Sequence, residues 1–359
     1  MRGLIEFSSR PEVRNVVEQL TGNRNVQGVV AEYQQRWLSL MHTDPRLWEE
    51  MFRWWRHFGP PYPGPPLTQV TCVPLGLGPP RDQIQATWNS WFGAEEPFQL
   101  RVCLRPGASD QDSRKLDIDT NASFPIIFEE RPVARLSALR VNIGRSKGTI
   151  GGVVLGSAGD WLGITCGHVL AHGSTVSIED KQQSLLARLP RLFSGEPPIA
   201  GECIRRTELT RLAPNAACNP YGGVDPSNTL DVGVIQAPFG NAPLRKWNGP
   251  PSRRESARSG QVAKMLSATG ERAAQIGGLN IYYVLSDGPE SYCFGGLFEV
   301  LAPPHHDKIV HPSDSGAWIM RHGANGDEWF GIALGSDDLR GFAMFAEPVY
   351  TWLQTERLV

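Results

Sequence analysis

The sequence of 359 residues has no long apolar run and no excess of either charge. Nowhere do about 18 apolar residues follow one another, so we expect no membrane-spanning helix. Lys and Arg together number 35, and Asp and Glu together number 37, which leaves no overall field to attract nucleic acid or an anionic membrane. We therefore expect neither nucleic acid nor a membrane as a partner.

The N-terminus also lacks the pattern of an export signal, because charges interrupt MRGLIEFSSRPEVRN before an apolar core can form. The six cysteines are far apart, with no CxxC pair and no zinc-like spacing. We interpret them as reduced, buried thiols and predict a cytoplasmic protein that holds no metal and no cofactor. They are Cys72, Cys103, Cys166, Cys203, Cys218 and Cys293.

Three segments are predicted ahead of the C-terminal part. Residues 1–58 carry apolar side chains at helical spacing, for example in VRNVVEQL and VVAEYQQRWLSLM, and we predict two or three helices there. Residues 59–66, GPPYPGPP, forbid a helix and predict an extended linker. Residues 67–135 combine strand-like runs with a helix-like run, which indicates a small α/β or α+β unit.

From residue 136 to residue 359 the sequence changes to short β-rich runs separated by Gly, Pro, Asn and Asp. This texture is typical of all-β barrels and sandwiches. Strand candidates include GGVVLGS, WLGITCGHV, DVGVIQA and WFGIALG, and PVYTWLQTERL predicts a short final helix. The length and the pattern indicate a mainly β domain in this region.

Three residues of the β-rich region are candidates for acyl transfer by serine, which needs a hydroxyl, an imidazole and an orienting carboxylate. His168 ends an apolar strand in GITCGHVL, and Asp231 opens the strand DVGVIQA. Ser315 lies in the turn HPSDSGAWIM, where Gly316 leaves room for a substrate carbonyl. The order His, Asp, Ser along the chain matches one known serine-hydrolase arrangement and no other.

These motifs resemble those of the trypsin-like serine proteases, whose usual wording is T-A-x-H, D-[IV]-[AG]-[LV] and G-D-S-G-G. The segment GQVAKMLSATGERAAQIGGL is similar to the strand and turn that precede the nucleophile in that family. The resemblance covers residues 140–355 and implies two six-stranded antiparallel β-barrels of the chymotrypsin type. It also implies a serine endopeptidase that acts on a protein substrate through an acyl-enzyme on Ser315.

The resemblance further implies an oxyanion hole built from the backbone N–H groups of Ser313 and Ser315. Ser313 stands where the family has glycine, which disfavours some turn conformations. We therefore expect a hole that forms only when an activating protein partner docks on residues 1–130, and a protease domain that stays folded without that region. Similar cytosolic proteases joined to adaptor domains suggest a bacterial defence or cell-death system.

The same resemblance places the substrate pocket. Ile309 occupies the position of the pocket floor, and its apolar side chain favours an apolar or small substrate residue. Asp337 and Asp338 follow the wall strand and leave a preference for basic residues open. The wall, which also pairs with the substrate backbone, is predicted from Ala333, Leu334 and Gly335.

Several alternatives remain open at this point. Asp314 either accepts a newly cleaved N-terminus at Ile150, or caps a turn, or pairs with an internal Lys or Arg. The histidines at 305, 306 and 311 form a solvated loop rather than a metal site. The alternative functions are a catalytically silent trypsin-fold binding module, suggested by Ser313, and a housekeeping quality-control protease.

Overall fold

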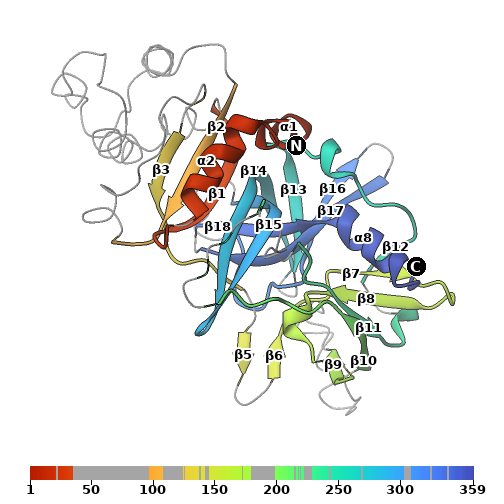
Figure 1. Ribbon diagram of the computed structural model, residues 1–359. Coiled ribbons are helices and arrows are strands. Elements are labelled where there is room, and N and C mark those ends of the chain that lie inside the picture. The colour runs from red at the N-terminus through yellow and green to blue at the C-terminus, as the bar shows by residue number, and fades with distance from the viewer. Residues whose placement is uncertain are drawn as a thin grey trace, which may run out of the picture.

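The computed structural model describes residues 1–21, 23–34, 97–107, 124, 126–136, 139–141, 145–171, 173–178, 199–213, 216, 218, 220–221, 229–241, 244–267, 270–302, 309–323, 326–337 and 339–359. The predicted linker at residues 59–66, residues 35–58 before it and most of the predicted segment 67–135 after it lie outside these residues. The described part is mainly β, with two large sheets that meet near the middle of the molecule and a separate two-stranded sheet (Figure 1).

Six C-terminal strands form a closed antiparallel ring. Their pairing order is β13-β16-β17-β18-β15-β14, and an additional pairing of β13 with β14 closes the ring. Alternate residues of β13 are buried, as expected of a strand with one face on a core. The strands are β13 (Val262–Ser267), β14 (Gly270–Asp287), β15 (Glu290–Leu301), β16 (Trp318–Gly323), β17 (Gly326–Ser336) and β18 (Arg340–Phe345).

The second sheet also has six strands, in the order β12-β7-β8-β11-β10-β9. Within the described residues no pairing closes it, and β12 runs parallel to β7. The expectation of a second closed antiparallel barrel is therefore not confirmed. The strands are β7 (Gly152–Leu155), β8 (Trp161–Thr165), β9 (Thr175–Ile178), β10 (Ile199–Arg206), β11 (Gly233–Gln236) and β12 (Arg245–Trp247).

The N-terminal region extends the sheet of the ring. Two helices, α1 (Arg2–Ser8) and α2 (Pro11–Thr21), agree with the predicted helical start. The helix predicted through VVAEY is wrong, because β1 (Val26–Tyr33) is a strand that pairs with β14 on one side and β2 (Phe98–Leu104) on the other. Seven of its eight residues are buried, including the polar Gln27 and Glu32, so its sequence lacks the alternation of apolar and polar residues that would reveal a strand.

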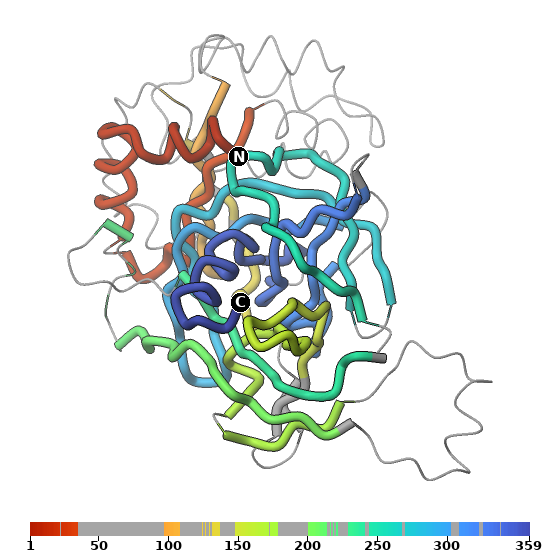
Figure 2. The backbone as a smooth tube through the Cα atoms, turned by 90° about the vertical axis from the view of Figure 1, so that its right-hand side faces the viewer, coloured from red at the N-terminus to blue at the C-terminus, as the bar shows by residue number. Residues whose placement is uncertain are grey.

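Strand β3 (Ile126–Glu130) completes this extension by pairing with β2 in parallel. The described N-terminal residues and the C-terminal ring thus share one sheet. Figure 2 shows the red helices beside the blue ring, with the yellow-green sheet below. The remaining elements are the strands β4 (Arg135–Leu136), β5 (Leu139–Val141) and β6 (Arg145–Lys147), the 3-10 turns η2 (Gly167–Val169), η3 (Phe239–Asn241) and η4 (Arg254–Ser256), and the C-terminal helix α8 (Ala346–Thr355).

Buried ion pairs join the N-terminal strands to the ring. Arg101 of β2 donates to Glu299 of β15 at 2.6 Å, and Arg340 of β18 donates to Glu129 of β3 at 3.2 Å. Burial alone would raise the pKa of Glu129, but the neighbouring arginines lower it below its ordinary value. The full cluster, with every side chain at most 9% exposed, is Glu32, Arg101, Glu129, Arg131, Glu299, Asp337 and Arg340.

Two findings bear on the predicted setting of the chain. Cys218 and Cys293 form a disulfide, so the expectation that all cysteines are reduced is wrong for this pair. The structure brings the two sulfurs together from positions 75 residues apart, a proximity that spacing alone does not reveal. Cys103, Cys166 and Cys203 are free and buried, as expected.

In the described residues no helix is long and apolar enough to cross a membrane.

Candidate active site

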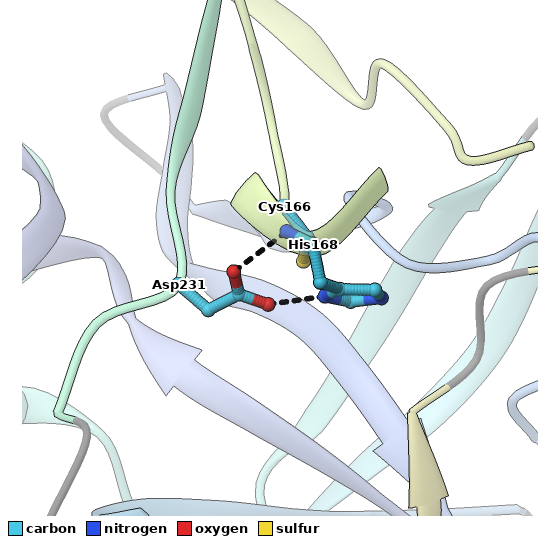
Figure 3. A group of neighbouring side chains, drawn as sticks. All are labelled: Cys166, His168 and Asp231. Atoms are coloured by element: carbon cyan, nitrogen blue, oxygen red, sulfur yellow. Dashed lines mark hydrogen bonds and ion pairs between the residues drawn. The ribbon is translucent and has the colours of Figure 1, made fainter. Parts of the chain in front are cut away.

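His168 and Asp231 come from the second sheet and meet where its central strand β8 ends and the neighbouring strand β11 begins. Strand β8 ends at Thr165, and η2 then turns the chain so that His168 stands just beyond the strand end. Asp231 lies two residues before β11 and is fully buried. Its Oδ1 accepts the backbone N–H of His168 at 2.8 Å, and its Oδ2 contacts Nδ1 of the imidazole (Figure 3). The carboxylate therefore holds both the backbone and the ring of His168.

Close approach at this corner depends on Gly167. A Cβ atom at residue 167 would lie 2.9 Å from Oδ1 of Asp231 and 3.0 Å from the carbonyl oxygen of Val232. Both distances are shorter than side-chain carbons normally show. Glycine is therefore needed for the carboxylate to reach the His168 backbone.

Ser315 comes from the other half, in the loop that leads into β16. Its Oγ lies 3.0 Å from Nε2 of His168 and 3.0 Å from the carbonyl oxygen of Leu334. Gly316 follows with φ +96°, and a Cβ there would lie 2.0 Å from the carbonyl oxygen of Thr149. The three predicted catalytic side chains thus meet where the two sheets touch, with Asp231 and Ser315 on opposite nitrogens of His168.

The loop before Ser315 contains the backbone groups that are expected to form the oxyanion hole. Ser313 has φ +80°, a left-handed conformation that non-glycine residues seldom adopt. Its carbonyl accepts a hydrogen bond from Oγ1 of Thr149 at 2.8 Å, which fixes the following peptide plane. Among the described residues, neither the N–H of Ser313 nor that of Ser315 has a hydrogen-bond acceptor. Within the part of the chain that the structure describes, both N–H groups therefore remain candidate donors to an oxyanion.

Asp314 is neutralised from inside the chain. It is 1% exposed, forms an ion pair with Arg272 of β14 and accepts the backbone N–H of His311 at 2.6 Å. Of the predicted alternatives, the structure has both the turn cap, at His311, and the internal arginine. Sequence reasoning did not single out Arg272, because nothing in the strand GERAAQIGG distinguishes it from a solvent-facing charge.

The predicted pocket residues are buried, and two of them, Ala333 and Leu334, form hydrogen bonds with the loop that carries Ser315. Ile309 is 3% exposed, and the three wall residues are buried. The N–H of Ala333 donates to Ala317 at 2.8 Å, while its carbonyl accepts from Gly316 at 2.9 Å, so its backbone is already used. Gly335 is paired with Leu136 of β4, an element that the sequence analysis did not predict.

Cys166 lies beside His168 and Asp231, and the potential ligand atoms of the three residues are within 4.8 Å of one another (Figure 3). Burial, reinforced by Asp231, raises the pKa of the Cys166 thiol well above its usual value. The thiol instead donates to the carbonyl of Ala333 at 3.2 Å. Because metal ligation and nucleophilic attack both need the thiolate, the group fits a hydrogen-bonded triad better than a metal site.

Other sequence candidates fall outside the site or outside the described residues. Of the three clustered histidines, only His311 is described, and it is exposed. Asp337 is buried and bound by Arg131, at 2.7 Å from Nη2 to Oδ1. It accepts the backbone N–H of Arg340 as well, at 2.8 Å. Asp338 lies outside the described residues.

No protein-family model matches the chain, and no curated protein is significantly similar to it. Several solved protease structures do show a likeness. Nocardiopsis protease has 15% identity and a TM-score of 0.35, with 61% of this chain and 95% of that chain covered. The Rv3671c protease from M. tuberculosis, active form, has 20% identity, a TM-score of 0.29 and coverage of 54% and 68%.

The NS6 protease from murine norovirus 1 has 15% identity and a TM-score of 0.27, with 55% of this chain and 92% of that chain covered. Likeness at this level leaves the family of the chain open. The functional assignment therefore depends on the geometry of the chain's own residues.

Proposed function

We propose that this chain is a serine endopeptidase of the trypsin-like type, with Ser315 as nucleophile, His168 as general base and Asp231 as the orienting carboxylate. The observation that carries the proposal is the continuous line of contacts from Asp231 through both nitrogens of His168 to the Oγ of Ser315, which lies 3.0 Å from Nε2. This is the arrangement that acyl transfer by serine requires.

The chemistry follows from these contacts. His168 takes the proton of the Ser315 hydroxyl as Oγ attacks the substrate carbonyl, and Asp231 stabilises the imidazolium that forms. The N–H groups of Ser313 and Ser315 donate to the oxyanion. His168 then gives its proton to the leaving amine, which leaves an acyl ester on Oγ. A water molecule, deprotonated by His168, hydrolyses the ester and restores the hydroxyl.

The charges around the wall strand favour an apolar or small substrate side chain. Arg131 neutralises Asp337, whose carboxylate also accepts backbone N–H groups. Asp337 therefore offers no free negative charge to a basic substrate residue. Together with the apolar Ile309 this supports cleavage after apolar or small residues.

The proposal is tested with a fluorophosphonate probe, which reacts with an activated serine. We expect labelling of the purified protein that is absent from Ser315→Ala and strongly reduced in His168→Ala. Labelling of equal extent in the wild type and in Ser315→Ala would refute the proposal. Ser174, whose hydroxyl lies at the surface and donates to Ala171, provides a matched control, since Ser174→Ala should leave labelling unchanged.

The burial of Ser315, which has no exposed surface, favours the catalytically silent binding module as the second candidate. A silent module would not react with the probe under any condition. The same proposal extends, by architecture alone, to a regulated cytoplasmic protease of a defence system with a partner docking on residues 1–130. Constitutive degradation of unfolded casein without a partner would instead favour a housekeeping protease.

A further inference from the structure

A peptide substrate of the proposed enzyme needs a free strand edge beside Ser315. Extended peptides commonly bind proteases and other receptors by adding a strand to a sheet edge, where backbone hydrogen bonds hold them. The relevant edge here belongs to Gly335 and Ser336, the last two residues of β17. They directly follow Leu334, whose carbonyl oxygen lies 3.0 Å from the Oγ of Ser315. The opposite edge of β17 is already paired with β18.

The edge beside Ser315 is occupied by the chain itself. Strand β4 pairs with it antiparallel, with Leu136 opposite Gly335 and Arg135 opposite Ser336. The same two residues of β17 pair with β18 on their other side, through Phe342 and Gly341. Both edges of β17 are therefore filled at the two residues that follow Leu334.

Several contacts hold β4 in this place. The N–H of Ser286, at the end of β14, donates to the carbonyl of Ala134 at 2.9 Å. Leu136 is 7% exposed and belongs to the apolar cluster that contains Leu334. A Cβ atom on Gly335 would lie 2.3 Å from the carbonyl oxygen of Arg135, so this glycine allows the two backbones to approach.

An ion pair fastens the start of the same segment. Arg131 donates from Nη2 to both carboxylate oxygens of Asp337, at 2.7 and 2.8 Å, and from Nε at 3.0 Å. Asp337 directly follows the residue of β17 that pairs with Arg135. A charged pair that is almost completely buried fixes geometry strongly, because neither partner is readily left alone. Residues 131–136 are thus held to β17 at both ends.

We propose that residues 131–136 are an intramolecular occupant of the peptide-binding edge, which a substrate must displace before Ser315 can attack it. The inference rests on the proposed function. The burial of the nucleophile agrees with it, since Ser315 has no exposed surface and the side chain of His168 is 4% exposed. The apparent affinity for substrate is then reduced by the fraction of molecules in which β4 has left the edge.

A reversible crosslink tests the inference directly. Arg135 and Ser336 are opposite one another, and directly paired residues of antiparallel strands place their side chains on the same face at disulfide-forming distance. The double variant Arg135→Cys with Ser336→Cys, in a Cys72→Ser background, is oxidised, and crosslinking is verified by mass. Hydrolysis of fluorescein-labelled casein and fluorophosphonate labelling are then measured before and after mild reduction.

We expect casein hydrolysis to fall at least tenfold in the crosslinked form and to recover on reduction, with no such change in the Cys72→Ser parent or in either single variant. Crosslinked protein that hydrolyses casein as fast as its reduced form would overturn the inference and leave the proposed function intact. Absence of probe labelling in both forms, with Ser315→Ala identical, would refute the proposed function and the inference with it.

A second variant covers the case in which the crosslink does not form. Leu136→Ala removes the anchor of β4, and casein hydrolysis is expected to rise several-fold. Leu297→Ala is the matched control, because Leu297 of β15 is fully buried in the same cluster but belongs to another strand. A rise of equal size in both variants, or no rise in folded Leu136→Ala, would contradict occupancy of the edge by β4.

Discussion

The two halves that meet at the candidate triad bury charge very differently. In the described part of the second sheet, from residue 152 to residue 247, the single buried charged side chain is Asp231, the triad carboxylate. The ring and its N-terminal extension bury seven charged side chains in the cluster described above, and Asp314 in addition. Burying a charged side chain is costly unless it is paired. The buried charges therefore have a different role in each half.

In the second sheet the packing is apolar, and the one buried carboxylate serves His168. A small cluster that includes Val153, Cys203, Ile235 and Phe239 forms this core. In the ring the charges join strands that are far apart in sequence, such as Arg101 with Glu299. The N-terminal strands are therefore part of the half that presents Ser315. Their removal would deprive Glu299 of Arg101 and Arg340 of Glu129, although Glu299 and Arg340 also pair with each other. This loss of buried partners argues against a protease half that stays folded when that region is deleted.

Backbone hydrogen bonds connect the two halves next to the nucleophile. The N–H of Thr149 donates to the carbonyl of Ser315 at 2.7 Å, and the N–H of Gly151 donates to Gly316 at 3.2 Å. A Cβ atom on Gly151 would lie 2.3 Å from the backbone nitrogen of Trp318, so the halves are in close backbone contact here. The triad thus forms only when the two halves are docked against each other in this position.

The largest expected effect tests whether the two halves act as one catalytic unit. Alanine at Ser315, His168 or Asp231 should each reduce kcat by about 10⁴-fold or more, because each member is useless without the others. The double variant Ser315→Ala with His168→Ala should be no worse than Ser315→Ala. Steady-state kinetics on casein-derived peptides measure this. Losses that multiply in the double variant would show that the two residues act independently.

The next effect compares buried with exposed ion pairs. Arg101→Ala removes a buried guanidinium that Glu32, Glu129 and Glu299 share, and it should lower the free energy of unfolding by about 3–5 kcal/mol. Arg205→Ala, which breaks a surface pair between β10 and Glu356, should cost less than about 1 kcal/mol. Urea unfolding of both variants measures the difference. Equal and small losses would mean that the buried cluster does not hold the N-terminal strands.

Lowering the pH should destabilise the folded protein through the same cluster of buried ion pairs. The arginines lower the pKa of buried Glu129, so the folded state holds its carboxylate charged more readily than the unfolded chain does. Stability from this group is therefore present above the unfolded pKa, about 4.3, and is lost as the pH falls through the lower folded value. Urea midpoints between pH 6 and pH 3 should decrease, and Glu129→Gln should flatten part of that decrease. A wild-type midpoint that rises in acid would contradict this sign.

Features that depend on local sequence motifs were predicted, whereas features that depend on contacts between residues far apart in the sequence were not. The order of three short motifs, each at a strand end or a turn, was enough to select His168, Asp231 and Ser315, because motif order needs no knowledge of packing. Arg272, β4 and the disulfide were not predicted. Each depends on residues brought together by the folded chain, and an arginine in a strand or a two-residue strand has no local signature.

The helical reading of VVAEY failed for a related reason. Strand β1 has neighbours on both sides and buries polar residues, Gln27 and Glu32, along with its apolar ones, so no alternation of apolar and polar residues marks it as a strand. Ser313 was recognised as a departure from the glycine of the resembling family, and its conformation is the one that glycine adopts easily. The sequence thus identified Ser313 as unusual but did not reveal its left-handed backbone conformation.

The smallest expected effect concerns that strain. Ser313, at φ +80°, and Arg357, at φ +57°, are the two non-glycine residues with positive φ in the described part of the chain. Glycine at either position removes a steric cost of about 1 kcal/mol but also loosens the unfolded chain, so unfolding free energies should change by no more than about 1 kcal/mol in both variants. Arg357 lies beyond the last helix, where its backbone serves no catalytic role.

The two variants should therefore differ in kinetics rather than in stability. If the N–H of Ser313 donates to the oxyanion, Ser313→Gly will populate that orientation more readily and raise kcat by up to a few-fold, whereas Arg357→Gly will leave kcat unchanged. Peptide hydrolysis at saturating substrate, with urea unfolding of the same samples, makes the comparison. Equal kcat in Ser313→Gly and the wild type would show that the serine at this position does not limit formation of the oxyanion hole.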